Sequence, residues 1–180
     1  DTDIGATFDD SDSLAITISN VNEAPTVTLT NPVTSLAENT DTSSGSTKVA
    51  DITVTDDGTG TNVLSLTGAD AAMFEIVGGN ELHLKAGVTL DFETNPSLDV
   101  TVRVDDAQIG VTFDDSDSLA IAISDVNEAP TVTLSNPVTT LAEDADTSSG
   151  SIKVADITVT DDGMGTNVLS LTGDDAAMFE

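Results

Sequence analysis

The sequence predicts an all-β chain built of tandem Greek-key β-sandwiches, with about seven strands in each repeat. Short apolar segments of alternating pattern are separated by turn signals roughly every 8 to 12 residues, which is typical of a sandwich. The apolar residues are mainly Val, Ile and Leu, which favour strands, and the chain has no Trp or Tyr and only 5 Phe. The same pattern also recurs along the chain at a fixed spacing, as it does in repeat architectures.

A long internal repeat defines the organisation of the chain. The stretch VNEAPTVTL begins at Val21 and again at Val126, which sets a spacing of 105 residues. At that offset residues 1–75 and 106–180 differ at 12 positions, so 63 of 75 are identical. We therefore expect three segments: the C-terminal strand of a truncated repeat in 1–22, a complete repeat in 23–127, and the N-terminal half of the next repeat in 128–180.

Strands of the complete repeat are expected where apolar residues alternate with polar ones. These segments are Thr26 to Leu29, Val49 to Thr55, Leu64 with Leu66, Phe74 with Ile76, Leu82 with Leu84, Leu98 to Val104, and Leu119 to Ile123. The pair Gly78-Gly79 predicts a hairpin turn, because glycine accepts the positive φ of a tight turn. Residues 68–74 are expected to hold one helical turn.

The remaining notable side chains have structural interpretations. Met73 and Phe74 are expected to fill the core. The single His83 lies between Leu82 and Leu84, so alternation should turn it away from the core, and it has no second His for a zinc site or a catalytic pair. The DDSDS stretches, Asp9 to Ser13 and Asp114 to Ser118, are expected to be solvated acidic surface, with binding of an extra ion as the alternative.

Charge restricts the partners of this chain. It has 33 acidic residues against 4 basic ones, a formal net charge of −29, so we expect no nucleic-acid partner and no direct membrane contact. Cations are the natural counterpart. The chain is 38% hydrophobic with a mean hydropathy of +0.03, which is too apolar for a disordered acidic tail. There is no Cys, so neither disulfides nor thiolate metal sites can form.

Acidic and amide side chains gather where the expected strands end. Since strand ends meet at the poles of a sandwich, these groups can come together at a junction between successive repeats. Ca²⁺ takes six to eight oxygen ligands and needs neither Cys nor His. The clusters are Glu38; Asp91 and Glu93; Asp56, Asp57 and Asn62; Asp105 and Asp106; and the stretch from Asp125 to Pro130.

The order of these motifs resembles the cadherin-like repeats of large bacterial surface or secreted adhesin-type proteins. The resemblance covers residues 23–127 in full and both flanks in part. Its motifs read, in order, Glu38-Asn39, Asp56-Asp57-Gly58 with Asn62, Leu90-Asp91-Phe92-Glu93, Asp105, and Asp125-Val126-Asn127-Glu128-Ala129-Pro130. The resemblance implies a cadherin-like sandwich in which the junctions between repeats bind Ca²⁺.

The resemblance also implies which residues hold the ions. For the junction after the complete repeat they are Glu38, Asp91, Glu93, Asp125, Asn127, Glu128, Asp161 and Asn167. For the earlier junction they are Asn20, Asn22, Glu23, Asp56, Asn62 and Asp105, with Asp57 as a substitute carboxylate. The family's second linker Asp is Glu128 here, its following Asn is Ala129, and Gly58 and Gly163 replace an Asp. We therefore expect fewer ions per junction than vertebrate cadherins hold.

These observations predict a calcium-rigidified extracellular or bacterial cell-surface region that acts as an extender or spacer in adhesion. Its partners would be calcium ions and the neighbouring repeats of the chain, with the distal ligand unknown. An accessory or carbohydrate-binding module of a secreted polysaccharide-degrading protein is the alternative, although the absence of Trp and Tyr disfavours it. Direct homophilic adhesion is a third. We expect no enzymatic activity, because a module of this size offers no aromatic sugar platform beside its carboxylates.

Overall fold

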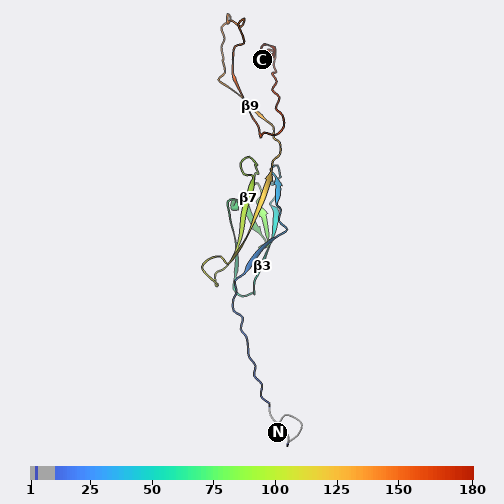
Figure 1. Ribbon diagram of the computed structural model, residues 1–180, viewed down its shortest axis with the longest axis vertical. Helices are drawn as coiled ribbons and strands as arrows, with labels where there is room; N and C mark the ends of the chain where they lie inside the picture. The colour runs from blue at the N-terminus through green and yellow to red at the C-terminus, as the bar shows by residue number, and fades with distance from the viewer. Residues whose placement is uncertain (1–2, 4–10) are drawn as a thin grey trace. The chain divides into compact units, whose positions relative to one another are not determined.

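The computed structural model describes residue 3 and residues 11–180 and is almost entirely β in that part of the chain (Figure 1). The strands are β1 (Thr26–Thr30), β2 (Ser35–Ala37), β3 (Thr47–Thr55), β4 (Asn62–Thr67), β5 (Phe74–Val77), β6 (Glu81–Leu84), β7 (Ser97–Asp106), β8 (Asp115–Ser124), β9 (Thr131–Ser135) and β10 (Asp156–Thr160). Two short 3-10 helices, η1 (Ala71–Met73) and η2 (Ala176–Met178), complete the list. The prediction of an all-β chain is confirmed.

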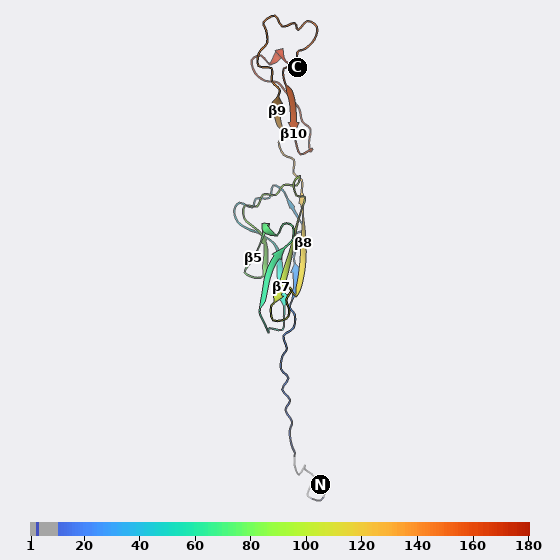
Figure 2. The same cartoon turned by 90° about the vertical axis from the view of Figure 1, so that its left-hand side faces the viewer.

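The strands form two four-stranded sheets and one two-stranded sheet. The strand orders are β1-β3-β6-β5, β2-β8-β7-β4 and β10-β9. Several neighbours, such as β1 with β3 and β4 with β7, are antiparallel but not consecutive in the sequence, which is the connectivity of a Greek-key sandwich. Figure 2 shows β7 and β8, which are neighbours in the second sheet.

The described residues divide into two compact units. The first comprises the described part of 1–32 with 48–83 and 100–119, and the second comprises 33–47, 84–99 and 120–180. The buried apolar residues of the first unit are Val27, Val49, Ala50, Ile52, Phe74, Leu82, Val100, Val102, Val104 and Leu119. Those of the second are Leu84, Leu90, Leu98, Ile121 and Ile123. Most of these positions come from the alternating segments that predicted strands.

Local conformation follows the sequence closely in the β5–β6 hairpin. Gly78 and Gly79 both have positive φ, 62° and 78°, as the turn requires. Phe74 is 1% exposed and Met73 is half-buried, so the core-filling role predicted for Phe74 is confirmed. His83 lies between two fully buried leucines and contacts the carboxylate of Glu81 at 3.1 Å. Its side chain is only 13% exposed. His83 is therefore more buried than expected for a side chain turned away from the core.

Strand β2 was not predicted. It has three residues, too few for an alternating pattern to register, and it pairs in parallel with β8, with Leu36 opposite Ile123. The chain therefore changes partner after β1, which pairs with β3 in the other sheet. This change of sheet places the residue after β2, Glu38, beside the end of β8.

The repeat of the sequence reappears as a repeat of geometry. Strands β9 and β10 pair in the same register as β1 with the second half of β3: Val132 lies opposite Val159, as Val27 lies opposite Val54. The residues that follow β1 and β9, Asn31 and Asn136, both adopt positive φ near 50°. Each donates its side-chain amide to the equivalent carboxylate, at 2.8 and 2.9 Å.

The two partial repeats are less complete. Residues 11–25 form no strand, although the equivalent of residues 11–19 in the complete repeat belongs to β8; Leu14, Ile16 and Ile18 are at least 77% exposed. The rest of the strand expected within 1–22 falls on residues 1–2 and 4–10, outside the described part. In residues 128–180 only β9, β10 and η2 form. The sequence given holds no counterpart of β7 beside residues 11–19, and none of β7 or β8 beside β9 and β10.

The acidic stretch at the start of β8 closes the edge of β1. Asp115 accepts a hydrogen bond from the Val27 N–H and Asp117 one from the Leu29 N–H, both at 2.8 Å. Asp114 accepts one from the Asp106 N–H at 2.5 Å. These carboxylates therefore do more than solvate the surface. Asp9 and Asp10 of the other DDSDS stretch lie outside the described residues.

No helix in the described part of the chain has both the length and the apolar character needed to cross a membrane.

We predict that Asp115→Ala and Asp117→Ala each destabilise the chain by about 1–3 kcal/mol, because each leaves a β1 amide without its acceptor. Asn at either position should recover part of the loss, since its carbonyl oxygen can still accept. Urea unfolding measures the stability, and hydrogen exchange at Val27 and Leu29 reports the local effect. Ser116→Ala, at the exposed position between them, is the matched control and should change little. Equal effects in all three variants would contradict the edge-closing role.

Candidate metal centre

Glu38 is a buried carboxylate that joins three segments of the second unit. It follows β2, and its N–H donates to the Ser124 carbonyl at the end of β8, at 3.1 Å. Glu38 is only 7% exposed. One carboxylate oxygen accepts from the Phe92 N–H at 2.8 Å and the other from the Val126 N–H at 2.5 Å. The loop after β6 and the segment after β8 are thus both tied to this side chain.

The loop after β6 supplies two more carboxylates. Asp91 accepts hydrogen bonds from both the N–H and the hydroxyl of Thr94, each at 2.8 Å, and its carbonyl accepts from the Asn95 N–H at 2.9 Å. These bonds close a tight turn that holds Glu93. Because Phe92 is bound to Glu38, Glu93 is kept next to that side chain.

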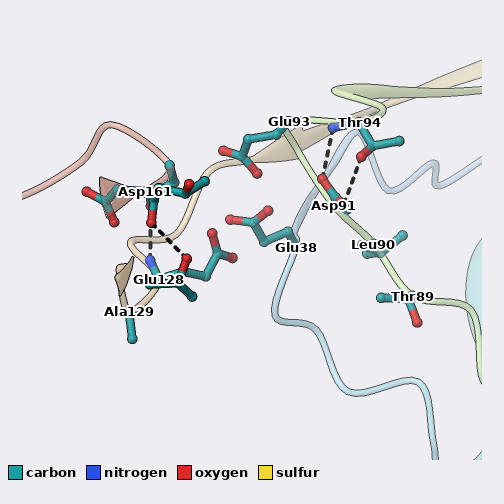
Figure 3. A pocket seen from close by; sticks show the side chains of 12 residues that line it. Glu38, Thr89, Leu90, Asp91, Glu93, Thr94, Glu128, Ala129 and Asp161 are labelled. Carbon is teal, nitrogen blue, oxygen red and sulfur yellow. Dashed lines mark hydrogen bonds between the residues drawn. The ribbon is translucent and has the colours of Figure 1, made fainter. Parts of the chain in front are cut away.

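The third segment, after β8, contributes Glu128. Its N–H donates to Asp162 at 2.9 Å, which ties the segment to the loop after β10. Carboxylate oxygens of Glu38, Glu93 and Glu128 all lie within 4.8 Å of one another. Figure 3 shows these three carboxylates pointing toward one another from three different segments. Asp91, Asp161 and Asp162 line the same pocket.

Of the other predicted ligands of this unit, Asp161 lines the pocket, whereas Asp125, Asn127 and Asn167 are not among its lining residues. Asp161 accepts from the Asn167 side-chain amide at 2.8 Å through one oxygen, while its other oxygen is buried without a hydrogen-bond partner. One oxygen of Asp125 is likewise buried and unpartnered. The amide of Asn127 donates to the Glu128 carbonyl at 3.3 Å. Buried carboxylate oxygens are normally satisfied, so these two oxygens are free to accept a further bond.

The carboxylates of this pocket are electrostatically unfavourable on their own. Desolvation raises the pKa of Glu128, and the charges of Glu38 and Glu93 raise it further. Desolvation also raises the pKa of Asp125, together with the charges of Asp162 and Glu38. A hydrogen bond from its own backbone opposes the shift at Glu93, but desolvation and the neighbouring carboxylates outweigh it, so that pKa is raised as well. A divalent cation among them would remove this cost.

A related cluster lies in the first unit. Asp56 accepts from the Asn62 amide at 2.8 Å, and its other oxygen is buried and unpartnered, as in the equivalent Asp161. Asp57 accepts from the Asn20 amide at 2.7 Å and from the Thr59 N–H at 2.8 Å. A hydrogen bond with Asp57 raises the pKa of Glu23, assisted by desolvation and the two Asp charges.

Asp106, rather than the predicted Asp105, joins this second cluster. Its carboxylate accepts from the Asn22 amide at 3.0 Å and from the Gln108 N–H at 3.0 Å, and these bonds lower its pKa. The residue is 1% exposed, and its carboxylate lies so close to Gly60 that a Cβ there would clash. Asp105 pairs with Val63 in the ladder between β4 and β7.

Eight of the fifteen predicted ligands thus belong to the second unit and seven to the first. Those of the second unit are Glu38, Asp91, Glu93, Asp125, Asn127, Glu128, Asp161 and Asn167, and those of the first are Asn20, Asn22, Glu23, Asp56, Asp57, Asn62 and Asp105. The sequence places Asp106 in an acidic cluster beside Asp105 but does not mark it as a ligand. The signal for Asp106 was available: it continues the alternation of buried Val100, Val102 and Val104, whereas Asp105 is out of phase.

Comparison with known proteins gives a match at the level of structure. No family model matches the chain, and no curated protein matches it. Among solved structures, the protocadherin gammaB4 extracellular domain aligns with a TM-score of 0.51 and 24% identity, over 78% of this chain and 22% of that one. A protocadherin gammaB7 EC3-6 cis-dimer structure aligns with a TM-score of 0.49 and 23% identity, over 62% and 28%.

Human protocadherin-24 EC1-2 also aligns, with a TM-score of 0.42 and 21% identity, over 81% of this chain and 62% of that one. The chain spans less than a third of the length of the two gamma protocadherin chains. Likeness at this identity concerns the fold alone. The chain has a cadherin-like β-sandwich fold.

Proposed function

We propose that this chain is a calcium-binding repeat region of an extracellular surface adhesin, in which Ca²⁺ stiffens the junctions between repeats and the array acts as an extender or spacer. One observation carries the proposal: Glu38, Glu93 and Glu128 come from three segments and place carboxylate oxygens within 4.8 Å of one another. Three like charges this close repel one another. A divalent cation among them is the simplest group that makes the electrostatic energy favourable.

The donor set suits Ca²⁺. Every candidate ligand offers oxygen, from carboxylates, amides or backbone carbonyls, and calcium takes six to eight such ligands in flexible geometry. The unpartnered buried oxygens of Asp125 and Asp161 are additional donors that the chain itself leaves free. The chain has no Cys and one His, so a soft or borderline metal has little to bind. When bound, calcium would supply charge neutralisation and cross-linking of three segments.

The charge of the complete repeat supports a stiffening role. Residues 23–127 hold 18 acidic and 3 basic side chains, so successive repeats repel one another until cations bind. Sites of extracellular modules typically have affinities of about 10⁻⁴ to 10⁻³ M, which suits a supply outside the cell. The near-identity of neighbouring copies favours a spacer over a recognition code, since interchangeable repeats add length. We place the protein at the cell surface, as in bacterial adhesins, and assign it no enzymatic activity.

Calcium should raise the melting temperature of the chain by several degrees over its value in EDTA. At about ten times Kd a single site adds about 1.4 kcal/mol of stability, because calcium binds the folded state in preference to the unfolded one. Glu93→Gln combined with Glu128→Gln should abolish most of that increase, since two of the three converging charges are removed. Differential scanning calorimetry in EDTA and in about 5 mM Ca²⁺ measures the effect, at a concentration above the expected Kd range.

The matched control is Glu143→Gln. Glu143 is the counterpart of Glu38 one repeat later, but it is exposed and belongs to no carboxylate cluster found in the described residues. Its variant should respond to calcium as the unmodified chain does. An unchanged melting temperature of the unmodified chain in calcium would overturn the proposed function.

Removal of one crowded charge should stabilise the calcium-free chain in a pH-dependent way. Because the pKa of Glu128 is raised on folding, the ionised form is disfavoured in the folded state. In EDTA, Glu128→Gln should therefore be more stable than the unmodified chain at neutral pH. Its advantage should shrink as the pH falls through the raised pKa toward the ordinary value for Glu, where both states are protonated. Urea unfolding at several pH values measures it; an advantage independent of pH would contradict the electrostatic origin.

A further inference from the structure

The two copies of the junction differ at two positions that contact each other in the first copy. The first has Asn20 and Thr59 where the second has Asp125 and Met164. The other junction residues are unchanged between copies: Asn22 and Asn127, Glu23 and Glu128, Asp56 and Asp161, Asp57 and Asp162, Asn62 and Asn167. Only 12 of 75 aligned positions differ at all, so two differences within one small contact stand out.

In the first copy, these residues bind each other through hydrogen bonds. The Asn20 amide donates to the Asp57 carboxylate at 2.7 Å and to the Thr59 hydroxyl at 2.8 Å. The Thr59 N–H donates to the second oxygen of Asp57 at 2.8 Å. Both N–H donors of one amide group bind a single loop. Hydrogen bonds within the chain therefore hold the segment before β1 to the loop after β3 without a metal ion.

The second copy cannot make this contact. A carboxylate has no donor, so Asp125 cannot bind Asp162 as Asn20 binds Asp57, and Met164 lacks the hydroxyl. Asp162 keeps the bond from the Met164 N–H, at 2.9 Å, which is equivalent to the Thr59 bond of the first copy. Its other oxygen accepts from the Glu128 N–H at 2.9 Å in place of a side-chain amide. One oxygen of Asp125 remains buried with no hydrogen-bond partner.

We propose that Asn20 and Thr59 form a metal-independent latch that replaces part of the calcium contact, so the two junctions of this chain differ in calcium requirement. This inference rests on the proposed calcium function. At the first junction an amide supplies the fastening and one negative charge is absent. At the second junction Asp125 supplies a charge and a free oxygen, and the fastening depends on the cation. A single chain thus carries junctions that respond to different calcium concentrations.

The second junction is the place to test the latch, because this chain contains all the segments that form it. In the full chain, Asp125→Asn with Met164→Thr gives it the residues of the first copy. Calorimetric titration with CaCl₂ should show Kd at this site raised at least about tenfold, the consequence of losing a charged ligand. In EDTA, the side-chain amide protons introduced at position 125 should exchange with solvent several-fold more slowly than those of an exposed Asn. Asp125→Asn alone should weaken calcium binding but give less protection.

The reverse experiment tests the first junction directly. The side-chain amide protons of Asn20 should be protected from exchange in EDTA in the unmodified chain, and Thr59→Met should reduce that protection at least about twofold, since one of two acceptors is lost. Asn22, whose amide binds Asp106, is the internal control and should not change.

The outcomes separate the two proposals. If the unmodified chain binds calcium and the double variant binds it equally tightly, the difference between junctions is overturned while the calcium function stands. If the unmodified chain binds no calcium, the calcium function fails, and the differing calcium requirement fails with it. Unprotected Asn20 amide protons in EDTA would overturn the latch whatever calcium does.

Discussion

The placement of the carboxylates depends on one interaction, the bonding of the buried Glu38 carboxylate to the backbone of two other segments. Its oxygens accept from the N–H groups of Phe92 and Val126, and its own N–H is bound to the end of β8. Without these bonds the loop after β6 and the segment after β8 would be free to separate, as the repulsion among their acidic groups favours. Neutral backbone N–H groups therefore hold close together carboxylates that repel one another.

The carboxylates are preorganised, and hydrogen bonds from nearby groups offset the repulsion among them. Charge-assisted hydrogen bonds are stronger than neutral ones, so a carboxylate is a good choice for tying loops together. The same group then contributes negative potential to the pocket. Asp162 works in the same way, since it accepts the N–H groups of Glu128 and Met164 and also lines the pocket. Asp57 accepts the Thr59 N–H and the Asn20 amide.

Much of this could be predicted from the sequence, because it depends on local periodicity and on the repeat. Alternation located the long strands, Gly78-Gly79 located the hairpin, and the order of acidic motifs located the segments that carry the converging carboxylates.

The features that the sequence did not predict depend on tertiary contact. Strand β2 is too short to have a pattern of its own, and its partner β8 lies far away in sequence. The ligand prediction for Asp105 followed a motif and remains a prediction, whereas the phase of β7 buries Asp106. No sequence pattern showed that Asp115 and Asp117 bind β1, because an acidic pair on a strand reads as solvated surface.

The contacts that close the complete repeat share one spacing along the chain. Val27 with Asp115, Leu29 with Asp117, and Glu38 with Val126 are each 88 residues apart. Contacts this distant form late, because a long loop must close first. As the chain is synthesised from its N-terminus, the last partners of β1 and β2 become available only when β8 has been made. In every repeat, β1 and β2 are therefore made before their partner β8. During that interval the nearly identical counterpart of β8 in the preceding repeat is the nearest competing partner.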